Sequence, residues 1–259
     1  WQRWWPGQKL NDTTYRYQDY YYVVNKILLN GAQITIVNQN NSVKGFLKFE
    51  DYGLDSTQFT WASNCLYSSN PIKRFSEYFR LIKLKKNVKG FLKGVNRYFD
   101  NQENVYGMKI GLEKITQSSL ISVKDTFQYY PSTKEIYQMI KTLENYILKV
   151  HGEKAGFPML HVQKEGPQKF VTMAAIPTAE VLPSENNILL KQMVLGSPLL
   201  VSEVRGGVQT IINGERELSN YVSDYKKLSP AISFQSLVTD RQMERDTSKW
   251  ITKLYYPIF

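Results

Sequence analysis

Residues 143–147 read Leu-Glu-Asn-Tyr-Ile, and residues 218–222 read Leu-Ser-Asn-Tyr-Val, 75 positions later. Each pentapeptide lies in a predicted helix, at about 133–150 and 208–228, and each helix stands between predicted strands. The strands expected around the first helix are 120–126, 157–163 and 170–181, and those around the second are 199–204, 232–239 and 250–258. Both regions therefore predict the same order of strand, helix, strand and strand.

A second match covers the last strand of each set. Residues 169–172 (Lys-Phe-Val-Thr) match residues 249–252 (Lys-Trp-Ile-Thr) at an offset of 80, and the extra five positions fit a longer turn before the second copy's last strand. Neither copy alone would bury both its helix stripe and its sheet face. We therefore predict one domain at 107–259, built from two β-α-β-β repeats at about 118–182 and 197–259, with pseudo-twofold symmetry and a concave sheet.

The first part of the chain predicts a different arrangement. Residues 15–67 are rich in Tyr, Val, Ile, Phe and Thr, and turn signals such as Asn30-Gly31 interrupt them, as in an antiparallel sheet. Residues 71–100 then predict one long amphipathic helix with Asn70 as its N-cap. The fold class is therefore α+β, with a domain at 1–106 in which a long C-terminal helix covers an antiparallel sheet.

The net charge of +10 comes from 33 basic and 23 acidic residues, and it is unevenly distributed. Residues 1–117 hold 17 basic and 9 acidic residues, and residues 71–100 alone hold nine basic residues against two acidic ones. A solvated helix face explains these lysines, and contact of the basic helix 71–100 with an anionic membrane surface is the alternative. We expect no direct binding of nucleic acid.

Several kinds of site are not expected from the residue counts. With Cys65 as the one cysteine and only His151 and His161, the chain cannot form an internal disulfide and offers few ligands for a metal site. No phosphate loop or dinucleotide fingerprint appears, so no cofactor is expected. No run of about 18 apolar residues is present. Because the first residue is Trp1, we expect the natural chain to extend upstream, which leaves a cytoplasmic or a membrane-anchored location open.

Alternation along the predicted strands places a row of aromatic and Met side chains on the sheet face opposite the helices. Such side chains suit a planar or amphipathic ligand, and the alternative is that they form core. Trp250 has the other parity, but it lies at a strand end, where twists and bulges are common. The candidate ligand-binding residues are Met159, Met173, Glu203, Phe234, Trp250, Lys253 and Tyr255.

Two of these residues would set the charge preference of the site. Glu203, if buried among aromatic side chains, would attract a cationic ligand, whereas Lys253 would favour an anionic one. Lys253 could also pair with Glu203 across the sheet and form a structural ion pair. In a rival hypothesis, Glu203 or His161 activates water as a catalytic residue, although no nucleophile motif accompanies them.

Three segments of the C-terminal half resemble GyrI-like small-molecule-binding domains, the effector domains of several multidrug-responsive and AraC-type regulators. They are residues 173–177 (Met-Ala-Ala-Ile-Pro), 202–207 (Ser-Glu-Val-Arg-Gly-Gly) and 246–258. The resemblance spans about 118–259 and implies a pseudo-symmetric ligand cleft, with hydrolysis of reactive molecules in some relatives. Where relatives often carry Thr-Glu, this chain has Thr252-Lys253, which argues against a cationic drug as ligand and against acid/base hydrolysis.

The first part resembles, by pattern, the polyketide-cyclase or START-like (SRPBCC) helix-grip family. A Trp-x-x-Trp-Trp-Pro motif at residues 1–6 precedes the predicted sheet and the long helix. Members usually begin upstream of such a motif, so the resemblance implies an incomplete first domain. They bind lipids, polyketides and other apolar molecules between sheet and helix, and here Phe59, Trp61 and Tyr78 are the residues placed for that role or for core packing.

We therefore predict a protein that binds an apolar or amphipathic small molecule, as a sensor or by sequestration, and that is not an enzyme. Hydrolysis of an electrophilic small molecule in the GyrI-like cleft is the first alternative. An effector module of a transcriptional regulator is the second, although residues 1–117 contain no legible helix-turn-helix.

Overall fold

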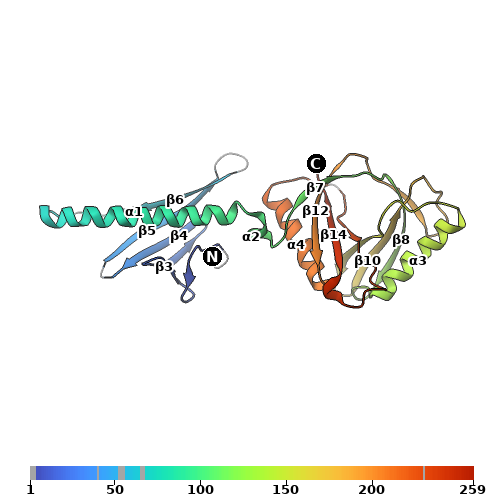
Figure 1. The fold of residues 1–259 in the computed structure, drawn as a ribbon, viewed down its shortest axis with the longest axis horizontal. Helices are drawn as coiled ribbons and strands as arrows, with labels where there is room; N and C mark the ends of the chain where they lie inside the picture. Colours follow the sequence, from blue (N-terminus) through green and yellow to red (C-terminus); the bar gives the residue numbers. More distant parts are fainter. Residues whose placement is uncertain (1–3, 40, 52–55, 65–67, 230) are drawn as a thin grey trace. The chain divides into compact units, whose positions relative to one another are not determined.

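The computed structural model describes residues 4–39, 41–51, 56–64, 68–229 and 231–259, so Trp1 and Cys65 lie outside the described residues. The chain divides into two compact units, Trp1–Val105 (unit 1) and Tyr106–Phe259 (unit 2). Unit 1 combines one antiparallel sheet with one long helix, and unit 2 combines one antiparallel sheet with two (Figure 1). The predicted α+β class is therefore confirmed.

Unit 1 is a meander of six strands followed by one long helix, α1 (Pro71–Phe99). The Asn70 side chain caps α1 by accepting hydrogen bonds from the backbone N–H groups of Ile72 and Lys73, as the sequence predicts. No helix in the described part of the chain is long and apolar enough to cross a membrane. The strands, in sheet order, are β1 (Gln8–Lys9), β2 (Thr14–Tyr17), β3 (Tyr20–Leu28), β4 (Gly31–Asn38), β5 (Asn41–Asp51) and β6 (Thr57–Ser63); the short α2 (Gln102–Tyr106) follows α1.

Aromatic rings hold α1 against the sheet of unit 1. The Phe91 ring of α1 stacks on Tyr22 of β3 at 5.0 Å between centroids, and Trp5 lies 4.6 Å from Phe91. The Tyr22 hydroxyl donates a 2.6 Å hydrogen bond to the Asn87 side chain of α1. Because Tyr22 and Phe91 are fully buried, these contacts form the centre of the core of unit 1.

Unit 2 contains an eight-stranded antiparallel sheet that is strongly curled (Figure 1). Its strands pair in the order β11-β8-β10-β9-β13-β14-β12-β7. Two 17-residue helices, α3 (Thr133–Lys149) and α4 (Val208–Asp224), lie between strands in the chain, and a short 3₁₀ turn (Thr247–Lys249) precedes the last strand. The strands are β7 (Gly111–Lys114), β8 (Ser119–Phe127), β9 (Met159–Gly166), β10 (Lys169–Pro177), β11 (Leu189–Gln192), β12 (Pro198–Arg205), β13 (Phe234–Leu237) and β14 (Ile251–Pro257).

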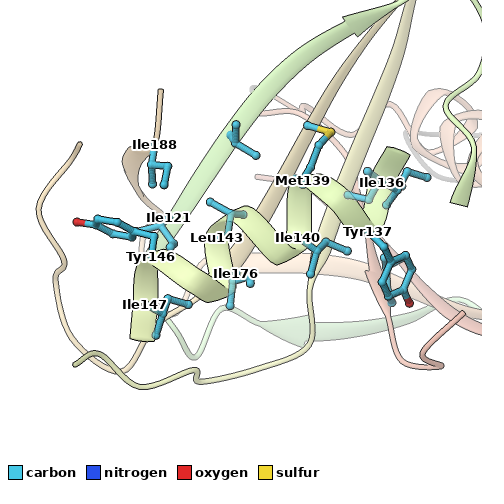
Figure 2. Close-up of a cluster of buried hydrophobic side chains, with 14 of the residues drawn as sticks. Ile121, Ile136, Tyr137, Met139, Ile140, Leu143, Tyr146, Ile147, Ile176 and Ile188 are labelled. Atoms are coloured by element: carbon cyan, nitrogen blue, oxygen red, sulfur yellow. The ribbon is translucent and has the colours of Figure 1, made fainter. Parts of the chain in front are cut away.

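Both helices of unit 2 pack on the same face of the sheet, that is, on side chains at every second position of the strands. Leu143 and Ile140 of α3 lie in one buried cluster with Ile121 of β8 and Ile176 of β10 (Figure 2). In α4, a Cβ added to Gly214 would meet Leu254 of β14 at 2.6 Å, so glycine permits the close approach. The side chains at the alternate positions, which include Lys253 and Tyr255 on β14, lie on the face of the sheet away from both helices.

Candidate functional site

The strand register brings most of the predicted ligand-binding side chains together on one surface of unit 2. Met173 lies opposite His161, and Met159 lies opposite Ser236, which in turn lies opposite Lys253. Glu203 of β12 lies opposite Lys253, and Phe234 opposite Tyr255. We call this set the helix-free face; its members are Met159, His161, Met173, Glu203, Phe234, Lys253 and Tyr255.

Two aromatic rings form the centre of the helix-free face. The rings of Phe234 and Tyr255 are stacked, with centroids 5.0 Å apart and planes inclined by 20°. Both side chains, like those of Met159 and Met173, are half-buried, so solvent reaches them. An accessible aromatic pair beside two methionines offers contact area to a planar or apolar molecule with few directional demands.

Glu113 of β7, which the sequence did not single out, connects two of the predicted residues. Its carboxylate accepts a 3.0 Å hydrogen bond from Lys253 Nζ and a 2.9 Å bond from the Tyr255 hydroxyl. Burial raises the pKa of Glu113, but the hydrogen bonds from Lys253 and Tyr255 and the charge of Lys253 together bring it below its ordinary value. Lys253 is therefore neutralised by Glu113 and not by Glu203, the partner weighed from sequence.

Glu203 lies at the edge of the helix-free face. Its side chain is 46% exposed, and its Oε1 atom is 3.5 Å from Nη2 of Arg205. An exposed ion pair of this length contributes little to stability, because water screens both charges. The carboxylate is thus not buried among aromatic rings, which was the condition for a strong attraction to a cationic ligand.

Trp250 is not part of the helix-free face. Its indole Nε1 donates to the backbone carbonyl of Glu244 at 2.8 Å, and the Arg241 guanidinium lies 4.9 Å from the ring centroid. Arg241 also donates to the Thr252 hydroxyl, whose parity is that of the helix-covered side. Trp250 thus shares the strand parity of Thr252 and not that of the helix-free face, and its role in ligand binding stays a prediction.

His161 presents one unpartnered nitrogen on the helix-free face. Its Nδ1 lies 2.7 Å from the backbone carbonyl of Ser233, which assigns the proton to Nδ1 and leaves Nε2 as an acceptor. Nε2 is buried and has no hydrogen-bond partner in the part of the chain that the structure describes. His161 therefore keeps one unused hydrogen-bond acceptor, closed to solvent, on the strand beside Met173.

A second polar cluster, also missed from sequence, lies on the helix-covered side. Glu215 of α4 accepts a 3.1 Å hydrogen bond from Gln235 of β13, and burial raises the pKa of the Glu215 carboxyl. Arg241, 5% exposed, donates its backbone N–H to the Tyr137 hydroxyl at 2.6 Å, and burial lowers the pKa of its guanidinium. These bonds tie α3, α4 and the loop after β13 to the sheet.

The described residues include no group of three or more His, Cys, Asp or Glu side chains arranged to hold a metal ion. Neither a family model nor a curated protein matches the chain.

Solved structures resemble the chain in fold. The cryo-EM structure of an EcmrR–DNA complex matches at a TM-score of 0.52 and 15% identity, over 73% of this chain and 72% of that chain. The crystal structure of the EcmrR C-terminal domain matches at a TM-score of 0.50 and 14% identity, over 59% of this chain and 98% of that chain. At such identities the likeness concerns the fold, and unit 2 is similar to an EcmrR C-terminal domain.

Proposed function

We propose that unit 2 is a small-molecule-binding domain of the GyrI-like kind and that its ligand lies on the helix-free face. The observation that carries the proposal is the stacked, solvent-accessible pair of Phe234 and Tyr255 with Met159 and Met173 on the neighbouring strands. A sheet face without helices that keeps these large side chains half-exposed has contact area that the fold itself does not use.

A repeated order of elements in unit 2, which agrees with the predicted internal duplication, supports the same proposal. The order β8-α3-β9-β10 recurs as β12-α4-β13-β14, and the helix-free face takes residues from both copies. The fold likeness to the EcmrR C-terminal domain agrees with this arrangement. In this proposal the ligand lies across the line where the two copies meet, between β9 and β13.

The chemistry of the helix-free face favours a planar, mostly apolar ligand without a strong charge. Lys253 and Glu113 neutralise one another, and Glu203 lies beside Arg205, so the charges nearest the two aromatic rings are paired. Lys124 of β8, opposite Met173, is exposed and has no ion pair among the described residues. His161 Nε2, which is buried, would accept one hydrogen bond from a ligand that displaces the side chains covering it. A binding role, as a sensor or by sequestration, requires no catalytic side chain in addition to these residues.

Hydrolysis stays the weaker alternative. Its candidate bases are His161, whose Nδ1 is held by a backbone carbonyl, and Glu203, which is exposed. A general base is more effective when a carboxylate orients it, and no carboxylate hydrogen-bonds to His161 among the described residues.

A role as the effector module of a transcriptional regulator is the second candidate, because EcmrR, whose fold unit 2 shares, was solved in complex with DNA. Direct DNA binding by this chain is not part of the proposal. A gel-shift assay of the full chain at low salt checks this, since a sequence-specific shift would contradict it.

Titration with the neutral, planar dye Nile red, followed by its fluorescence, tests the proposed site. Phe234→Ala should weaken binding about tenfold, because it removes one of the two stacked rings. Leu148→Ala, which shortens an exposed apolar side chain on α3, is the control and should leave the affinity unchanged. Equal affinities for the parent chain and Phe234→Ala would place the dye elsewhere and defeat the proposal.

A further inference from the structure

Unit 1 contains a large cavity between α1 and the ends of four strands. Its volume is about 1380 Å³, larger than the ~300–1,000 Å³ of ordinary small-molecule pockets. Its walls come from the β2–β3 connection (Arg16 to Tyr21), from β4 and β5 at residues 36–39 and 41–43, and from α1 between Ser76 and Lys93. The cavity therefore lies beside the core of Tyr22 and Phe91.

The charge of this cavity is almost entirely positive. One carboxylate, that of Asp19, lies among the lining residues. The lining cations are Arg16, Arg80, Lys83, Lys86, Lys89 and Lys93. None of the six is ion-paired with any residue that the structure describes.

Four of these cations form one stripe along α1. Lys83, Lys86, Lys89 and Lys93 follow one another at intervals of three and four residues, which places neighbours one turn apart on the same side of the helix. Like charges at this spacing repel one another and destabilise a helix. All four side chains are exposed and line the open side of the cavity, where a bound anion would relieve the repulsion.

Hydrogen bonds fix the walls on both sides of the stripe. Arg80 Nη1 donates a 2.6 Å bond to the Asn41 side chain at the start of β5. Asn87 donates through Nδ2 to the Gln18 side chain at 2.9 Å. Arg16 donates its Nε to the Gln18 carbonyl at 3.0 Å. Each guanidinium has five N–H donors, so Arg16 and Arg80 both keep further donors for a ligand.

We propose that unit 1 binds a small molecule that carries two or more phosphate groups, in the cavity lined by Arg16, Arg80 and the lysine stripe. Arginine and lysine are the side chains that bind phosphate oxygens in proteins. Six such cations carry more positive charge than one phosphate group would neutralise. The volume also exceeds that of one phosphate and leaves room for an organic part against Tyr20, Tyr21 and Phe79. This site is separate from the one proposed in unit 2.

Calorimetry with inositol hexakisphosphate and the full chain tests the proposal, at about 0.15 M ionic strength so that distant charges are screened. We expect one bound molecule per chain. Lys86→Gln combined with Lys89→Gln should weaken binding about tenfold, because two exposed charge contacts to phosphate are lost. Asp19→Asn should strengthen it.

The matched control removes two lysines of α1 that do not line the cavity, Lys73→Gln with Lys85→Gln. It lowers the net charge by the same amount, so its affinity should stay close to that of the parent chain. If both double variants lose affinity equally, the binding reflects overall charge and the proposal fails. Absence of binding to the parent chain, with a normal circular dichroism spectrum, overturns it as well.

Vesicle sedimentation separates two sources of such a ligand. Phosphatidylcholine vesicles that contain phosphatidylinositol bisphosphate, bound by the chain and released by inositol hexakisphosphate, identify a lipid headgroup. Binding of the soluble probe alone identifies a free phosphorylated molecule. Equal binding to vesicles that carry phosphatidylserine instead, or tighter binding of a single-stranded oligonucleotide than of the soluble probe, contradicts the proposal.

Discussion

Lys253 on β14 donates a 3.0 Å hydrogen bond to Glu113 on β7, 140 residues earlier in the chain. β12 lies between these two strands in the sheet, so the bond reaches across it. The curl of the sheet shortens that distance, and the same carboxylate binds the Tyr255 hydroxyl. Glu113 thereby restrains both the edge strand and two side chains of the helix-free face.

Glu113→Gln should lower the free energy of unfolding at pH 7 by about 0.5 kcal/mol, a value that allows for solvent screening of this half-exposed pair. The folded-state pKa of Glu113 lies below its ordinary value of 4.5, so its stabilisation is present above pH 4.5 and is lost as the pH falls through the folded pKa. Urea denaturation should therefore show a gap between the two proteins at pH 7 that closes at low pH. A gap that is constant with pH would contradict this assignment.

Glu215→Gln should stabilise the protein at pH 8, by about 1 kcal/mol, because the carboxylate is charged and desolvated there while the amide can still accept from Gln235. The folded-state pKa of Glu215 is raised by burial, so wild-type stability falls as the pH rises from about 4.5 through that pKa. Thermal unfolding at pH 4 and pH 8 should show the advantage of the variant growing with pH. Glu217→Gln on the same helix is the control, and a pH-independent difference for Glu215→Gln would refute the prediction.

Gly45→Ala should destabilise unit 1 by about 1–3 kcal/mol. A Cβ at this position of β5 would lie 2.3 Å from Cζ2 of Trp61 on β6 and 2.9 Å from the Ala62 carbonyl oxygen. Gly166→Ala provides the comparison, because no atom lies within 4 Å of its added Cβ. Guanidinium denaturation followed by Trp fluorescence should separate the two substitutions, and equal midpoints would contradict the expected clash.

His161→Gln should weaken Nile red analogues that carry an N–H or O–H group more than Nile red itself. The loss expected is about fivefold, the equivalent of one hydrogen bond of about 1 kcal/mol. Nε2 is the atom left without a partner in the described structure, whereas Nδ1 is already bonded to Ser233. Equal losses for both dyes would show that His161 acts through packing alone.

Helix positions were predictable where local signals mark them. Asn70 and Pro71 mark the start of α1, and Ser132 forms with Glu135 the capping box at the start of α3. The end of α4 was predicted near residue 228 but falls at Asp224, and Lys226 has a φ of 49°. No glycine or proline marks that end, so the left-handed turn at Lys226 was not visible in the sequence.

The composition of the site was predictable only in part. Strand alternation identified the residues of the helix-free face, since period-two patterns decide which side chains share a face. Glu113 was missed because β7 is four exposed residues at a sheet edge, with no apolar pattern. Arg241 was missed because its burial depends on how the loop after β13 docks on Tyr137 of α3, a tertiary contact that local sequence does not encode.

The order of strands in the two units has a kinetic consequence. In unit 1 every strand pairs with its neighbour along the chain, whereas in unit 2 Lys114 of β7 pairs with Pro198 of β12. Chains whose strands pair locally fold faster than chains whose strands pair over a long sequence separation. Unit 1 should therefore fold early, and unit 2 should complete its sheet only after β12 and β14 have been synthesised, which exposes its unpaired strands to aggregation in the meantime.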